Sequence, residues 1–179
     1  MVDNVIFSPR ANLRFNPTQN INLRLSYSSG FRAPQAFDED MHIENVGGTV
    51  AMIERAKNLK EEKSQSFSAS ADMYHRFGVF QTNFLIEGFY TRLTDVFVLG
   101  EPYDRGDGIL VKTRSNGPGA KVMGLTLEGK VAYLSILQIQ AGLTLQRSRY
   151  DEPHKWHDDA PAEKKIFRTP DTYGYFTAT

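Results

Sequence analysis

The segment 150–164 holds the densest group of side chains in this chain that could bind a metal ion. Two imidazoles, His154 and His157, are followed by the carboxylates Asp158 and Asp159. Imidazole nitrogen and carboxylate oxygen are ligands of transition metals, and imidazole also binds haem iron. Loops that face water are, however, commonly rich in His, Asp and Lys without binding anything. The sequence therefore predicts no firm metal site and names only His154, His157 and Asp158 as candidates for one.

The remaining reactive residue types do not form a catalytic set. The chain has no cysteine, which excludes a thiolate nucleophile, a thiolate metal site and a disulfide framework. No motif places His75 beside a reactive serine, so a Ser-His-carboxylate triad is not indicated. The segment 117–121 lacks the Gly-Lys-Ser/Thr ending of a phosphate loop, and Arg105-Gly106-Asp107 lies in a Gly- and Asp-rich turn. We expect no enzyme and no cofactor.

Long segments of alternating polarity are the elements that must position these residues. Side chains alternate across a strand with a period of two, so each such segment has one apolar and one hydrophilic wall. The pattern predicts strands at 10–16, 20–31, 65–76, 79–98, 109–134, 136–149 and 166–178. We expect an all-β fold, an antiparallel meander of about seven strands. The formal net charge of zero argues against a nucleic-acid partner.

The length of these segments suits a membrane. Segments of about ten alternating residues match the spanning strands of a β-barrel. No run approaches the roughly 18 apolar residues of a membrane helix, so any lipid contact must be made by strands. Leu23, Leu25 and Leu143 are expected to face lipid. The opposite, hydrophilic wall is expected to comprise Asn22, Arg24, Ser66, Ser68, Ser70, Asp72, Gln138 and Gln140.

The connections between these strands alternate between short and long if 109–134 is one strand with a bulge at Gly117-Pro118-Gly119 rather than two strands. Outer-membrane barrels have short periplasmic turns and longer extracellular loops. The long segment 32–63 is expected to contain a helical turn around 49–63. Two aromatic girdles are predicted: Phe15, Phe77, Phe80 and Tyr133 beside the short turns, and Tyr27, Phe31, Phe97 and Tyr150 near the long loops.

Two motifs flank the long segment 32–63. Phe-Arg-Ala-Pro-Gln-Ala-Phe at 31–37 leaves one strand, and Asn-Leu-Lys-Glu-Glu-Lys-Ser at 58–64 enters the next. They resemble the Arg-Ala-Pro exit and Asn-Leu-x-Pro-Glu-x-Ser re-entry of the barrel of TonB-dependent outer-membrane transporters. The family pattern also resembles two further segments, Asn116-Gly117 leading to Gly124 and Arg168-Thr169-Pro170. The resemblance runs from about Ser8 to Thr179. Glu61 departs from the pattern where Pro is usual, and Leu125-Thr126 where Val-Glu is usual. The segment 88–97 looks like members from Bacteroidetes-type bacteria.

The resemblance implies that residues 1–179 are a C-terminal part of a 22-stranded barrel, a partial arc covering approximately strands 12 to 18. The plug domain and the terminal strands would then lie outside these residues. Residues 1–6 do not look like a signal peptide, which is compatible with a cytosolic protein or with an internal fragment. The strand expected at the C-terminus ends without a turn or a closing partner, so we expect an internal fragment.

The family's activity is uptake of a scarce, bulky ligand across the Gram-negative outer membrane. An iron chelate, haem, cobalamin or a glycan would fit. The implied partners are the protein's own plug domain, TonB acting through the plug, outer-membrane lipid and the ligand, with the hydrophilic wall facing the plug. The candidate ligand-facing loop residues are Arg32, His42, Tyr103 and Trp156.

Two rival hypotheses remain open. In a soluble β-sandwich or barrel serving as a binding module, the apolar walls would face a core instead of lipid. A small outer-membrane barrel enzyme would need an even strand number and a nucleophile. The length of the strands, the absence of a closing element and the family resemblance argue against the first hypothesis. Seven strands with an open end argue against the second.

Overall fold

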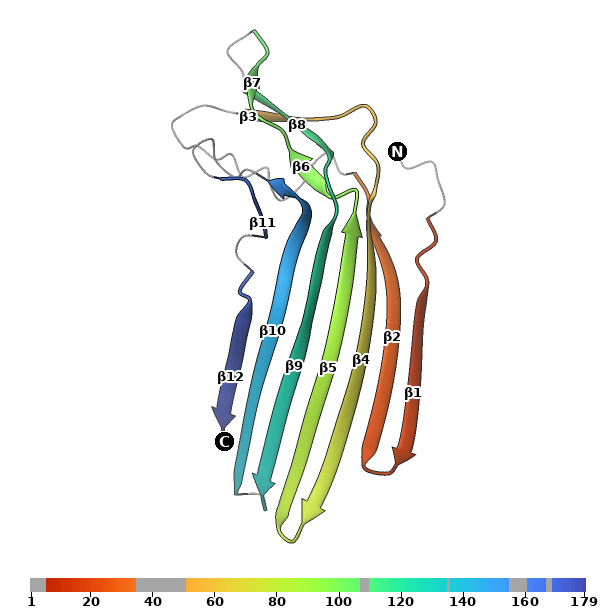
Figure 1. Cartoon of the computed structure of the whole chain (residues 1–179), viewed down its shortest axis with the longest axis vertical. Helices are drawn as coiled ribbons and strands as arrows, with labels where there is room; N and C mark the ends of the chain where they lie inside the picture. Colours follow the sequence, from red (N-terminus) through yellow and green to blue (C-terminus); the bar gives the residue numbers. More distant parts are fainter. Residues whose placement is uncertain (1–5, 35–50, 107–109, 135, 155–160, 167–168) are drawn as a thin grey trace.

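Seven long strands form one twisted antiparallel sheet (Figure 1). The computed structural model describes residues 6–34, 51–106, 110–134, 136–154, 161–166 and 169–179. The long strands are β1 (Arg10–Thr18), β2 (Ile21–Arg32), β4 (Glu62–Phe77), β5 (Phe80–Thr94), β9 (Ala120–Tyr133), β10 (Leu137–His154) and β12 (Thr172–Ala178). A short strand, β11 (Glu163–Lys165), also pairs with β10. The predicted all-β antiparallel meander is confirmed.

A second, smaller sheet lies at the top of Figure 1, beyond the end of the main sheet at which β2 and β5 end. We call this the outer end of the main sheet and the opposite end the inner end. It consists of β3 (Ala51–Arg55), β6 (Phe97–Leu99), β7 (Tyr103–Asp104) and β8 (Leu110–Asn116). β3 pairs with β8 in parallel, whereas β6 and β7 pair with it antiparallel. The connections β2–β4 and β5–β9 therefore build one structure together. No helix among the described residues is long and apolar enough to cross a membrane.

The small sheet corrects two predictions. Residues 51–55 are strand β3 rather than part of a helical turn. Residues 109–134 are not one bulged strand, because β8 and β9 belong to different sheets and separate at 117–119. Short and long connections nevertheless alternate, since β8 lies within the long outer connection from β5 to β9. At the start of that connection, Asp95 has a φ of 55° and turns the chain out of β5.

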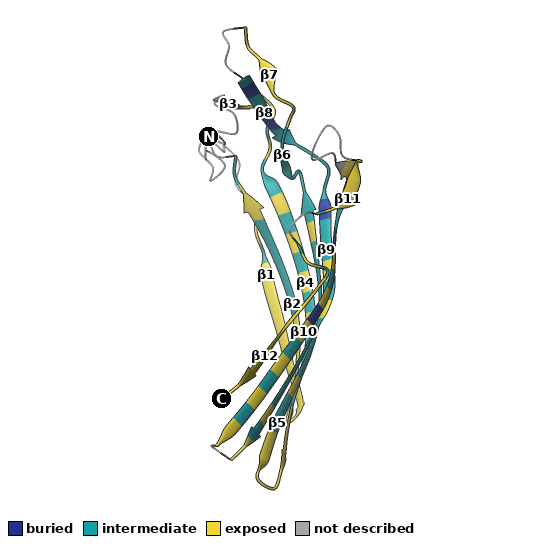
Figure 2. Ribbon diagram, turned by 90° about the vertical axis from the view of Figure 1, so that its left-hand side faces the viewer, coloured by how far each residue is buried: buried dark blue, intermediate teal, exposed yellow. Residues whose placement is uncertain are grey.

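The register across the main sheet gives it one apolar and one polar face. Leu25 lies opposite Leu13 and Ala69, and the same row continues through Gly88, Leu125 and Leu145. The large side chains on this apolar face are exposed, at 55% for Leu25 and 63% for Leu13. Figure 2 shows long exposed stretches on the main strands, and Val111 and Ala120 are the buried hydrophobic residues among those described. A sheet of this kind needs an apolar surrounding to cover it.

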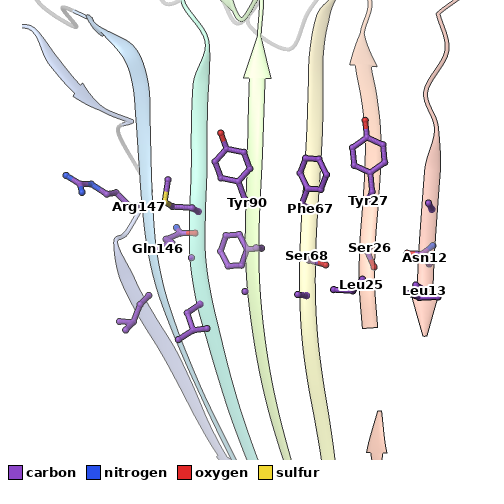
Figure 3. A pocket seen from close by; sticks show the side chains of 18 of the residues that line it. Asn12, Leu13, Leu25, Ser26, Tyr27, Phe67, Ser68, Tyr90, Gln146 and Arg147 are labelled. Atoms are coloured by element: carbon purple, nitrogen blue, oxygen red, sulfur yellow. The ribbon is translucent and has the colours of Figure 1, made fainter. Parts of the chain in front are cut away.

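Aromatic side chains mark both borders of the apolar face. At the inner border the Phe77 and Phe80 rings lie 5.7 Å apart, and the Phe80 and Tyr133 rings 5.2 Å apart. At the outer border Tyr27 lies opposite Phe67, with ring centroids 4.8 Å apart. Figure 3 shows Tyr27, Phe67 and Tyr90 at one level on neighbouring strands.

The height between these borders suits a bilayer. Phe67 and Phe77 are ten residues apart on β4, which corresponds to about 33 Å along the strand. A tilt of about 40° reduces this to about 25 Å, the height of the apolar band of an outer-membrane barrel. Two members of the predicted outer girdle are wrong: Tyr150 lies on the polar face because it follows the parity of Thr144, and Phe97 belongs to the small sheet.

Candidate functional site

The polar face collects the hydrophilic residues that alternation predicted to share a wall. One row runs from Arg24 through Ser70, Glu87 and Thr126 to Thr144. Ser68 and Asp72 flank Ser70 on β4, and Gln140 has the parity of Thr144 on β10. The predicted grouping of Asn22, Arg24, Ser66, Ser68, Ser70, Asp72, Gln138 and Gln140 on one face is confirmed by this register.

Cross-strand hydrogen bonds satisfy part of this polar face. The hydroxyls of Ser66 and Thr91 are 2.9 Å apart, and those of Thr126 and Thr144 are 3.1 Å apart. Other polar atoms have no partner: Asn22 Oδ1 and Ser148 Oγ are buried without a hydrogen bond in the described structure. Buried polar atoms favour a partner. These two atoms are covered by neighbouring atoms, so they can reach a new partner only if the side chains around them move.

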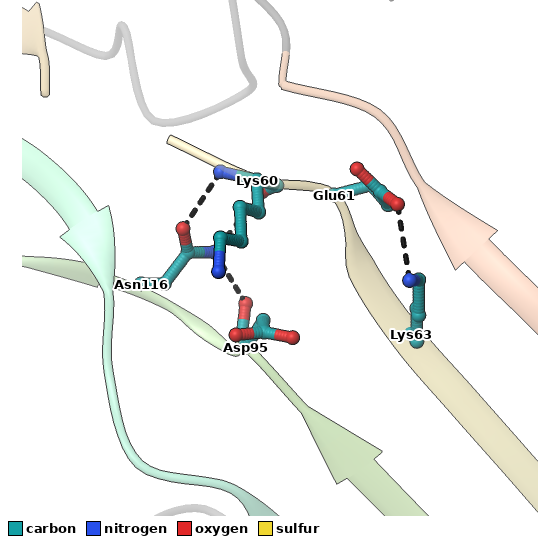
Figure 4. Close-up of polar contacts among 5 residues, drawn as sticks. All are labelled: Lys60, Glu61, Lys63, Asp95 and Asn116. Atoms are coloured by element: carbon teal, nitrogen blue, oxygen red, sulfur yellow. Dashed lines mark hydrogen bonds and ion pairs between the residues drawn. The ribbon is translucent and has the colours of Figure 1, made fainter. Parts of the chain in front are cut away.

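The small sheet is joined to the main sheet through the side chain of Asn116 (Figure 4). Asn116 Nδ2 donates to the carbonyl oxygens of Lys60 (3.0 Å) and Asp95 (2.8 Å). Asn116 Oδ1 accepts from the Lys60 amide at 2.7 Å. One amide group thus connects the end of β8 with the start of β4 and the end of β5. We call this arrangement the Asn116 bridge.

The motif at 58–64 also supports the bridge. Phe97 N donates to Glu62 Oε2 at 3.1 Å, so the carboxylate of Glu62 satisfies the first amide of β6. Glu61 stands where the family pattern has Pro, and its carboxylate accepts a backbone hydrogen bond within its own residue. That bond, followed by the bond to Lys63 at 3.1 Å, lowers the pKa of Glu61 below its usual 4.5. Neither contact involves Asn116, so the side chain of Glu61 takes no part in the bridge.

Gly117 and Gly124, the two glycines of the motif that runs from Asn116 to Gly124, have no room for a side chain. A Cβ on Gly117 would lie 2.6 Å from Val98 Cγ1, and one on Gly124 would lie 2.6 Å from both the Leu145 carbonyl oxygen and Phe89 Cζ. Phe89 is the register partner of Gly124, and its ring covers the glycine. The sequence pattern Asn116-Gly117 signalled this region, but only the structure shows what the two residues do.

The candidate ligand-facing residues are not brought together among the described residues. Arg32 ends β2, with its guanidinium 5.6 Å from the centre of the Phe97 ring. Tyr103 is exposed in β7, opposite Val111. The backbone of His154 lies opposite Glu163. His42, Trp156, His157 and Asp158 lie outside the described residues, and so does the side chain of His154.

Comparison with known proteins agrees with the two-faced sheet. Residues 2–179 match the family described as TonB dependent receptor-like, beta-barrel. The chain belongs to this family. TonB-dependent receptor barrels lie in the outer membrane of Gram-negative bacteria. The chain is therefore a segment of an outer-membrane receptor barrel.

Solved structures share the fold of this TonB-dependent receptor segment. The FrpB iron transporter from Neisseria meningitidis (F5-1 variant) has 18% identity and a TM-score of 0.59, covering 96% of this chain and 26% of its own. The F3-3 variant has 19% identity and a TM-score of 0.57, covering 80% and 20% respectively. The chain thus spans about a quarter or less of the length of these transporters. No curated protein sequence matches it.

Proposed function

We propose that this chain is a wall section of a receptor that imports a scarce, bulky ligand with energy delivered through TonB. The observation that carries the proposal is the two-faced sheet within the family match: an apolar belt about 25 Å high on one side and a continuous polar face on the other. The polar face would lie against the plug domain. Exposed polar side chains on it, such as Arg24, would bond to plug residues or to water.

Within the complete barrel, the seven long strands would take the places of approximately strands 12 to 18, with the plug and the remaining strands supplied by the rest of the protein. The small sheet would project on the extracellular side and contribute to ligand capture, with Arg32 and Tyr103 near it. Origin from a Bacteroidetes-type bacterium stays a prediction from the amino-acid sequence of residues 88–97.

An iron compound is the ligand class we propose. Support comes from the similar structures of the FrpB iron transporter, and from the imidazoles of His154, the last residue of β10, and His157, three residues later in the sequence. Haem, cobalamin and glycans are the alternatives, and uptake experiments separate them.

The test is uptake by cells that carry the complete receptor gene, with a strain deleted for that gene and a second strain deleted for tonB as controls. The probes are ⁵⁵Fe-labelled ferric citrate, haemin, cyanocobalamin and a maltooligosaccharide. We expect accumulation of an iron probe that requires both genes. Equal accumulation in all three strains would contradict energy-coupled import, and gene-dependent uptake of only cobalamin or the oligosaccharide would contradict the iron assignment.

A further inference from the structure

A cluster of positive side chains lies on the apolar face, directly beyond its outer aromatic border. Arg92 on β5 lies opposite Lys121 on β9, which lies opposite Arg149 on β10, and Arg149 lies opposite Lys165 on β11. Arg147, two residues before Arg149, lies opposite Met123. These five residues, the outer cation cluster, share the face of Tyr90 and Met123. They therefore face the membrane side of the wall rather than the polar side.

The cluster carries more positive charge than its described neighbours neutralise. Asp151 lies 3.0 Å from Arg92 and 3.9 Å from Lys121, and Asp171 lies 2.8 Å from Lys165. Among the described residues, Arg147 and Arg149 make no hydrogen bond or ion pair within contact distance. Five cations and two carboxylates leave a net charge of +3. Like charges placed opposite one another on a sheet are unfavourable, so an anion bound here would relieve that repulsion.

An apolar hollow lies immediately inward of the cluster. Its volume is about 1160 Å³, and Arg147 is part of its lining. Ala69 and Gly88 lie opposite each other in its lining, in a row whose other members are leucines. A Cβ added to Gly88 would meet nothing within 4 Å. In Figure 3 the rings of Tyr27, Phe67 and Tyr90 border the hollow, and the Arg147 side chain reaches outward beside them.

The combination specifies the chemistry of an occupant. Guanidinium groups bind phosphate through paired, charge-assisted hydrogen bonds, and an apolar hollow in a membrane-facing wall accepts hydrocarbon. A soluble phosphate would not use the hollow, and an uncharged lipid would not use the cations. Both features are continuous with the apolar belt, so the matching molecule is one that already surrounds the barrel.

We propose that this face is a binding site for one phosphorylated, multiply acylated lipid of the outer leaflet. Its phosphates would lie on Arg147 and Arg149, with Arg92, Lys121 and Lys165 around them, and an acyl chain would fill the hollow over Ala69 and Gly88. The bound lipid neutralises the cluster and covers the small side chains at Ala69 and Gly88.

The test uses the complete receptor, purified in detergent and analysed by native mass spectrometry with bis-phosphorylated, hexa-acylated lipid A as the probe. We expect one tightly held lipid A and at least tenfold weaker binding for the double variant R147Q/R149Q. The variant R55Q/K57Q removes the same charge from exposed positions on the outer side, away from the apolar face, and is expected to bind like the unchanged receptor. G88L fills the hollow without changing charge, and is also expected to weaken binding.

Inorganic pyrophosphate and lipid A stripped of both phosphates distinguish the sources of affinity. Neither should compete effectively with lipid A. Undiminished binding by R147Q/R149Q, or an equal loss in R55Q/K57Q, would overturn the site. Effective displacement by pyrophosphate, or full affinity in G88L, would overturn its assignment to a lipid with a chain in the hollow. Uptake of iron plays no part in the readout, so the outcome is separate from that of the proposed transport function.

Discussion

Removing the Asn116 side chain should release the small sheet from the main sheet without unfolding the barrel wall. In the complete receptor, Asn116→Ala deletes the three hydrogen bonds of the bridge, two to the carbonyls of Lys60 and Asp95 and one from the Lys60 amide. A neutral hydrogen bond contributes about 0.5–1.5 kcal/mol net. Lys60 is exposed, so water replaces part of what is lost, and we expect about 2 kcal/mol for the whole bridge.

The lost stabilisation should make the small sheet open more often. Amide hydrogen exchange of the receptor in detergent measures the free energy of this opening. About 2 kcal/mol corresponds to about 30-fold faster exchange for amides that open with the bridge. The reporters are the amides of Ala56, Gly100 and Gly117, which donate to Arg114, Thr113 and Val96. Amides in the centres of β4 and β5 should keep their protection, because their ladder does not involve Asn116.

Controls make this prediction refutable. Asn58 lies in the same motif, is exposed and makes no hydrogen bond among the described residues, so Asn58→Ala should leave exchange unchanged. Asn116→Asp keeps acceptors but places a carboxylate against two carbonyl oxygens, and should open the sheet at least as much as alanine. Unchanged protection of the three reporters in Asn116→Ala would refute the reasoning, as would equal acceleration across β4 and β5.

Three further predictions test the faces, the packing and the charge of the wall. Ser68→Cys and Ala69→Cys are neighbours on opposite faces in a chain without cysteine. When each is labelled with a nitroxide in detergent and returned to membranes, the label at 69 should be relaxed mainly by oxygen, which partitions into lipid, and the label at 68 mainly by a water-soluble nickel chelate. The reverse preference would exchange the two faces. Gly124→Ala should destabilise the barrel by about 1–3 kcal/mol because its Cβ would meet Leu145 and Phe89. A Cβ at Gly129 would meet nothing within 4 Å, so Gly129→Ala should not clash. Equal losses of unfolding free energy in urea for the two variants would contradict the packing argument. The hydrogen bond from Lys165 holds the pKa of Asp171 below its usual 3.8. This contact therefore stabilises the folded state above the unfolded pKa of Asp171, and that stabilisation is lost as the pH falls through the lower folded pKa. An Asp171 titration measured by NMR that is the same in Lys165→Met as in the unchanged receptor would contradict this role of Lys165.

Sequence reasoning succeeded where the controlling physics is local. The period of two is a property of any extended strand, so the walls containing Leu25 and Ser68 could be assigned without knowing any pairing. It failed at 109–134, where Gly117 and Pro118 are compatible with either a bulge or a change of sheet. What decides between them is the Asn116 side chain, whose partners Lys60 and Asp95 lie 56 and 21 residues away.

Other limits of the sequence have the same origin. Tyr150 and Phe97 were assigned to a girdle by nearness to long loops, but nearness along the chain does not say which face or which sheet a ring joins. The metal candidates His154, His157 and Asp158 stay predictions, because their side chains lie outside the described residues.

The sequence by itself determined the fold class, the two walls of each strand and the family, because alternation and turn-forming motifs are written within short segments. Only the tertiary structure decided which residues of different strands share a row. Arg92, Lys121 and Arg149 are far apart in the chain, and none stands out in its own strand. Cross-strand hydrogen bonds set the register, and that register gathers them above an apolar hollow at the outer border of the wall.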